Sequence, residues 1–125
     1  MRSFVVVVAS IMFTSGCGDD KSDSLGIAAE CTAATDCNQD VSPPLVCLTH
    51  FKGGYCGLSG CTGDADCPSD ARCVTHTDAQ NYCFRTCVDK SECNANRTTD
   101  NEANCSSNIT LVGGGNAKAC VPPSG

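Results

Sequence analysis

Cysteine is the residue that most constrains what this chain can fold into. Of its 125 residues, 13 are cysteines, a density typical of small domains that disulfides hold together in an oxidising compartment. Aromatic residues make up only 5% of the chain and tryptophan is absent, so a large hydrophobic core is not available. The odd number of cysteines means that at least one of them has a role other than an internal disulfide.

Charge and motif content exclude several classes of function. The formal net charge is −6, which excludes a basic nucleic-acid-binding domain. The closest cysteine pairs, Cys83/Cys87 and Cys56/Cys61, are spaced too widely for a C-x-x-C redox motif. No motif supports a Cys-His or Ser-His nucleophile. The sequence therefore predicts a protein that is not an enzyme and that uses no cofactor.

The first 16 residues have the pattern of an export signal. Arg2 supplies a positive charge, and residues 4–13 form an apolar stretch that is too short to span a membrane. The small residues directly before Cys17 resemble a bacterial lipobox. That resemblance implies that residues 1–16 are removed and that Cys17 becomes a lipidated N-terminus anchored in a membrane. A secretory signal peptide without a lipid is the alternative.

Residues 17–30 are predicted to form a flexible acidic linker, because they are polar and have no periodic apolar face. In the sorting rule for bacterial lipoproteins, aspartate directly after the lipidated cysteine favours retention in the inner membrane. Gly18 stands at that position. The resemblance therefore implies an outer-membrane lipoprotein of a bacterial cell envelope, or a secreted protein if the lipid is absent.

The other twelve cysteines form a tandem repeat. They fall into units of four in residues 31–60, 61–86 and 87–125, and each unit begins with C-x5-C. Leu-Thr-His follows the third cysteine of the first unit, and Val-Thr-His follows that of the second. An acidic residue precedes the second cysteine of every unit, namely Asp36, Asp66 and Glu92. Agreement at several offsets indicates an internal repeat.

The repeat predicts a small disulfide-rich fold of three tandem four-cysteine units, with short β-hairpins, little helix and little hydrophobic core. A turn-rich segment separates the third cysteine from the fourth in each unit, which predicts one hairpin per unit. We expect a strand ending at residues 55–56 in the first unit, and strands that include residues 72–74 and 82–84 in the second.

Four cysteines allow three connectivities in each unit. We favour pairing of the first with the third and the second with the fourth, because the strand cysteines of many cystine-rich hairpins bond back to two earlier cysteines in parallel order. The predicted pairs are Cys31–Cys47, Cys37–Cys56, Cys61–Cys73, Cys67–Cys83, Cys87–Cys105 and Cys93–Cys120.

The second unit carries the signature C-x-x-D-x-D-C-x5-C, formed by Cys61, Asp64, Asp66, Cys67 and Cys73. This signature resembles the start of the N-terminal cysteine-rich region of Dickkopf proteins. It is also similar to the tandem repeats of cysteine-rich lipoproteins of the myxobacterial kind. The bacterial export signal makes the lipoprotein family the better match. The resemblance covers residues 31–120 and implies an architecture, without implying binding residues.

Two sets of residues are candidate metal ligands. Asp64, Asp66 and Asp70 are weak candidates for calcium, and the alternative is that these short acids cap turns through bonds to the backbone. His50 and His76 stand in C-x2-H spacing, which would suit zinc. Because exported cysteines in even units are expected to be oxidised, we assign no metal and expect both histidines to be solvated loop residues.

The sequence predicts an exported, membrane-anchored lipoprotein that acts as a non-catalytic binding or structural module at the cell envelope. No motif identifies a protein or envelope partner. The loops at residues 50–55, 75–82 and 94–104 are the expected contact surfaces, because loops are free to vary. The alternatives are a secreted inhibitor-like or toxin-like scaffold, and a calcium-dependent binding module.

Overall fold

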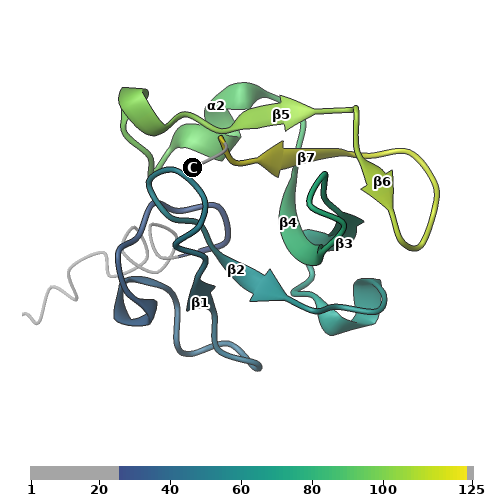
Figure 1. Ribbon diagram of the computed structural model, residues 1–125, viewed down its shortest axis with the longest axis horizontal. Coiled ribbons are helices and arrows are strands. Elements are labelled where there is room, and N and C mark those ends of the chain that lie inside the picture. The colour runs from purple at the N-terminus through teal and green to yellow at the C-terminus, as the bar shows by residue number, and fades with distance from the viewer. Residues whose placement is uncertain (1–25, 124–125) are drawn as a thin grey trace, which may run out of the picture.

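The computed structural model describes residues 26–123 and shows a small disulfide-rich fold, as the sequence predicts (Figure 1). The helical segments are short: η1 (Ala34–Asp36), η2 (Asp64–Asp66), α2 (Lys90–Asn94) and η3 (Thr99–Asn101). The strands are antiparallel: β1 (Val46–Cys47), β2 (Cys56–Ser59), β3 (Ala71–Thr75), β4 (Asn81–Cys87), β5 (Asn104–Ser106), β6 (Thr110–Leu111) and β7 (Lys118–Val121).

The three units share one plan. A short helical segment lies between the first and second cysteines of the first two units and includes the second cysteine of the third unit, and a pair of antiparallel strands carries the third and fourth cysteines. The antiparallel pairs are β1–β2, β3–β4 and β5–β7, so the prediction of short hairpins is confirmed, although in the third unit β6 lies between the two paired strands. In every hairpin the third and fourth cysteines stand opposite each other, as Cys47 and Cys56, Cys73 and Cys83, and Cys105 and Cys120.

The disulfides do not join these facing cysteines. Each strand cysteine bonds back to the C-x5-C turn, so the six disulfides are the six pairs that the sequence analysis favours. The Cα–Cα distance is 5.9 Å in all three first-to-third pairs, and 5.4, 5.5 and 5.3 Å in the second-to-fourth pairs. All six distances are ordinary for disulfides. The repeat in the sequence is therefore a repeat in three dimensions.

The acidic residue before the second cysteine closes the C-x5-C turn. Oδ2 of Asp66 accepts hydrogen bonds from the backbone N–H and the hydroxyl of Thr62, both at 2.8 Å. Asp36 does the same with Thr32, at 2.9 and 3.0 Å. In the third unit, Oε2 of Glu92 accepts a bond from the backbone N–H of residue 88. Local capping of the backbone by the side chain thus explains why an acidic residue precedes the second cysteine in every unit.

Strand β4 joins the three units into one sheet. It pairs with β2 of the first unit, with β3 of its own unit and with β7 of the third unit. Strand β6 adds a further link, because it pairs with β3. The strand expected to end at residues 55–56 instead begins at Cys56 and continues to Ser59, since its last residues pair with β4. The three units follow one another in sequence, and backbone hydrogen bonds between their strands join them.

Tyr55 lies where the three units meet and is completely buried. Its hydroxyl donates a hydrogen bond to the carbonyl oxygen of Cys120, at 2.8 Å, and accepts one from the backbone N–H of Arg85, at 3.2 Å. Its ring meets Phe84 edge-on, with centroids 5.3 Å apart. Burial raises the pKa of the Tyr55 hydroxyl far above its usual range, so the group remains a neutral donor. The side chain of Tyr55 in the first unit therefore forms hydrogen bonds to both of the other units.

Arg97 provides a second link between the units. Its side chain is buried, and the guanidinium carbon lies 5.9 Å from the centroid of the Tyr55 ring. Its nitrogens donate hydrogen bonds at 2.7–3.1 Å to four backbone carbonyls, those of Ala28, Lys52, Gly54 and Asn101. These bonds replace the water that a buried cation would lose. They hold the N-terminal segment and the first hairpin against the third unit.

The predicted flexible linker ends at residue 30, but the last residues of that range are packed against the fold. Of residues 17–30, those before residue 26 lie outside the described residues, as do Cys17 and the predicted signal peptide. Residues 27–29 are buried. Ala28 and Ala29 exchange two backbone hydrogen bonds with Cys56, at 3.0 and 2.9 Å. A short apolar stretch with strand-like bonds packs onto the first hairpin, although its composition indicated a linker.

The buried Tyr55 hydroxyl yields a stability prediction. Tyr55→Phe leaves a buried carbonyl and a partly buried N–H without their partner, so we expect a loss of about 2–4 kcal/mol in the free energy of unfolding. Guanidinium denaturation of the oxidised protein measures it. The matched control is Tyr82→Phe, whose hydroxyl bonds only to side chains at the surface and whose loss should cost about 1 kcal/mol or less. Equal losses would contradict the role assigned to Tyr55.

Candidate binding site

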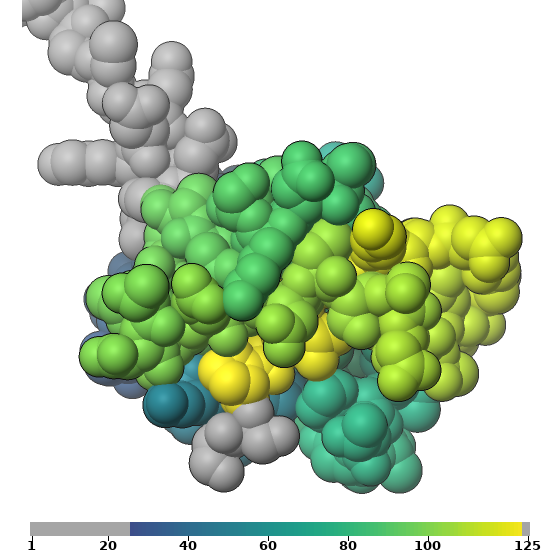
Figure 2. Space-filling model, turned by 90° about the horizontal axis from the view of Figure 1, so that it is seen from above, coloured from purple at the N-terminus to yellow at the C-terminus, as the bar shows by residue number. Residues whose placement is uncertain are grey.

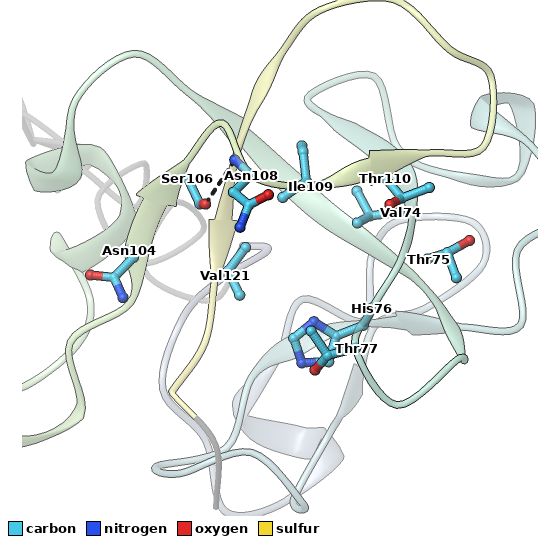
Figure 3. A pocket seen from close by; sticks show the side chains of 10 residues that line it. All are labelled: Val74, Thr75, His76, Thr77, Asn104, Ser106, Asn108, Ile109, Thr110 and Val121. Carbon is cyan, nitrogen blue, oxygen red and sulfur yellow. Dashed lines mark hydrogen bonds between the residues drawn. The ribbon is translucent and has the colours of Figure 1, made fainter.

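A pocket of about 330 Å³ opens between the second and third units (Figure 3). Its apolar part consists of Val74, Ile109 and Val121. Polar side chains surround this apolar part, and they come from residues 75–77 at the end of β3 and from residues 104–110 of the third unit. The pocket therefore combines an apolar surface with hydrogen-bonding groups, as small-molecule sites do.

Pairing of β6 with β3 creates this pocket. Thr75 pairs in register with Thr110, and Val74 with Leu111. This pairing draws the long segment between β5 and β7 back over the second unit. In Figure 2 the third unit, coloured green to yellow, covers most of the visible face. The hydroxyl of Ser106 accepts a hydrogen bond from the backbone N–H of Asn108, at 3.1 Å, and so fixes the turn that leads into β6.

The polar lining of the pocket carries no permanent charge. Most of its polar groups are hydroxyls and amides. Among the described residues, no Asp, Glu, Lys or Arg lines the pocket. In the part of the chain that the structure describes, His76 is the one titratable side chain that lines the pocket. The ring of His76 packs edge-on against Phe51 and Phe84, with centroid distances of 5.4 and 5.6 Å. Such a lining suits a neutral ligand that offers hydroxyl or amide groups.

Both histidines lie outside helices and strands, as expected, with His50 exposed and His76 half-buried, but each also packs against aromatic rings. His50 lies 4.1 Å from Phe51 between ring centroids, and both histidines contact the ring of Tyr82. The Tyr82 hydroxyl donates to Oδ2 of Asp78 at 2.6 Å, so its oxygen is left to accept from Nε2 of His50 at 3.0 Å. Burial and the bond to Asp78 raise the pKa of Tyr82 to about 12. The Leu-Thr-His and Val-Thr-His repeats converge on one aromatic cluster.

The structure corrects the expected contact surfaces. Phe51, Tyr55, Tyr82 and Ala103 lie in the predicted contact loops, yet all four are buried. Residues 75–77 and 104 of the predicted loops do line the pocket, but sequence reasoning missed its lining residues at 106 and 108–110. The available signal was the greater length of the third unit between its last two cysteines.

The calcium candidates are not gathered around one point. Among the described residues, Asp64, Asp66 and Asp70 do not form a group whose ligand atoms lie within metal-binding reach of one another. The carboxylate of Asp64 is occupied by Arg72, at 2.9 Å, and by the backbone N–H of Cys73. That of Asp66 caps its turn. Bonds to the backbone account for these two residues, which is the alternative that the sequence analysis set beside the weak calcium candidates.

The sulfur clusters do not provide a metal site either. Three cysteines in each unit have sulfur atoms close together. All of them are bonded in disulfides, which leaves no thiolate to bind a metal. Cys47 and Cys73, the cysteines of the two C-x2-H pairs, are bonded in disulfides as well.

Comparisons with protein-family models, with curated proteins and with solved structures gave no match to this chain. Within residues 26–123, no helix has both the length and the apolar character needed to cross a membrane. The six disulfides are compatible with an exported or extracellular protein.

The turn-capping aspartates predict how stability depends on pH. Backbone hydrogen bonds from Thr62 hold the pKa of Asp66 below its usual value, and bonds from Thr32 do the same for Asp36. A carboxyl whose pKa is lower in the folded state contributes stability above its unfolded pKa and loses it as the pH falls below about 4. We expect Asp66→Asn to reduce the acid-induced fall in melting temperature.

The control for this experiment is Asp100→Asn. Asp100 is exposed, and its carboxylate accepts no hydrogen bond from the described residues. Its removal should leave the slope of melting temperature against pH unchanged. If both variants flatten that slope equally, general charge repulsion rather than turn capping governs the acid response.

Proposed function

We propose that this protein is an exported, membrane-anchored cysteine-rich lipoprotein that acts as a non-catalytic binding module at the bacterial cell envelope. The anchor is a lipid on Cys17, and the outer membrane is the location favoured by Gly18. The family proposed is the cysteine-rich lipoproteins of the myxobacterial kind, whose repeat signature the second unit resembles.

One observation carries this proposal: twelve of the thirteen cysteines pair among themselves, which leaves Cys17 as the odd one. Cys17 follows an apolar stretch and two small residues, as a lipidated cysteine does. Complete pairing of the other cysteines agrees with an oxidising compartment outside the cytosol. A lipid on Cys17 would explain both the odd cysteine and the pattern that precedes it.

A binding role agrees with how the surface is built. Thr75, Ser106 and Thr110 of the pocket lie on strands that the disulfides and the shared sheet hold in place. This arrangement reduces the ordering cost when a ligand binds. The side chains of the pocket are neutral hydrogen-bonding groups arranged around an apolar surface. The pocket supports binding of a ligand better than chemistry upon it, because its lining within residues 26–123 contains no carboxylate pair and no free thiol.

Replacement of Cys17 tests the anchor. In a bacterial host that lipidates exported proteins, the mature protein should begin at residue 17, carry the added mass of acyl chains and sediment with membranes. Cys17→Ser removes the acylated atom, so we expect the protein to move to the soluble fraction without acyl mass. Intact-mass spectrometry and membrane fractionation measure both effects.

The matched control is Ser24→Ala, which changes a serine of the predicted linker and leaves the lipobox intact. It should remain acylated and bound to membranes. If the unaltered protein is released without acyl chains, the secreted alternative replaces the membrane anchor.

A further inference from the structure

We propose that the pocket between the second and third units binds one residue of a neutral sugar. This inference deepens the proposed function, since it assumes a binding module and names the class of its ligand. It depends on four features of the pocket: unpaired polar side chains, an apolar surface among them, the lack of charge, and size.

The first feature is a set of polar side chains that make no bonds of their own. The side chains of Thr77, Asn104, Asn108 and Thr110 form no hydrogen bond with any other residue in the described range 26–123. All four are exposed. In Figure 3 the side chain of Asn108 points from the third unit into the space above Val121 and His76. Amides and hydroxyls both donate and accept, so they can match the adjacent hydroxyls of a sugar ring.

The second feature is the apolar surface among these groups. Ile109 and Val121 are half-buried and supply the accessible apolar surface, whereas Val74 is almost fully buried and supplies none. A pyranose ring has a face made largely of C–H groups, and placing that face on Val and Ile side chains removes apolar surface from water. The pocket therefore fits a ligand that is apolar on one face and hydroxylated at its edge.

The third feature is the lack of permanently charged groups, which disfavours charged ligands. No carboxylate, ammonium or guanidinium group lines the pocket, within the part of the chain that is described. A phosphate, a carboxylated sugar or an amino sugar would lose water without gaining a charged partner. The pocket also has no exposed Trp, Tyr or Phe on which a nucleobase could stack.

The fourth feature is size. The volume of about 330 Å³ lies at the lower end of the range of about 300–1,000 Å³ found for ligand pockets. One sugar residue suits such a volume, and the rest of a chain would lie outside. Because few groups make contact, we expect weak binding in the millimolar range.

A titration followed by NMR tests this inference. The probes are glucose, galactose, mannose and N-acetylglucosamine, added to the oxidised ¹⁵N-labelled protein. At least one of them should shift the side-chain amide signals of Asn104 and Asn108 in a saturable way. Asn108→Ala should weaken that binding by about tenfold, the effect of losing one good hydrogen bond. Asn116→Ala is the matched control, because Asn116 is an exposed asparagine of the same segment outside this pocket.

Several results would overturn the inference. It fails if none of the four sugars shifts these signals, if Asn116→Ala weakens binding as much as Asn108→Ala, or if glucuronate binds more tightly than glucose. Methyl glycosides distinguish the source of the ligand. Binding that persists with the methyl glycoside shows that the pocket accepts a sugar joined to a chain through C1, and binding that requires the free sugar indicates a diffusible one.

Failure here is separable from failure of the proposed function. A protein that is acylated and membrane-bound but ignores all four sugars would retain the anchor and lose only the ligand class. A protein that binds a sugar but carries no lipid would retain the ligand class and lose the anchor.

Discussion

The two disulfides of each unit are the constraint on which the rest of the structure depends. Both cysteines of a hairpin bond back to the same C-x5-C turn, although they face each other across the strands. Because the first cysteine bonds to the third and the second to the fourth, the two disulfides together fix the C-x5-C turn and the register of the strands. The bonded cysteines are 12–27 residues apart in sequence, so each bond removes about 3 kcal/mol of unfolded-state freedom. With so few apolar residues, this restriction takes the place of a large core.

The units are not independent, because backbone pairing and two buried side chains join them. Strand β4 pairs with a strand of every unit, Tyr55 bonds to the other two units, and Arg97 bonds to backbone carbonyls from three segments. The third unit departs from the repeat through its long segment before the last cysteine. That segment supplies β6 and one wall of the pocket. Divergence from the repeat thus creates the candidate site.

The sequence predicted what is local to a unit and missed what joins units. Cysteine spacing gave the hairpins, and the acid before the second cysteine, as in Asp66, indicated turn capping because both ends of the bond lie within five residues. The burial of Tyr55 and the burial of residues 27–29 depend on partners more than 25 residues away, which no local pattern reveals. The pocket was missed for the same reason, since Val74 and Ile109 meet only through the β3–β6 pairing.

The pairing of the cysteines tests this account most directly. Proteolysis of the alkylated, non-reduced protein, followed by mass spectrometry, identifies which peptides remain linked. We expect linked peptides for the six first-to-third and second-to-fourth pairs, with no alkylated cysteine among residues 31–120. A bond between facing cysteines, such as Cys73 with Cys83, or a free thiol in this range, would contradict it.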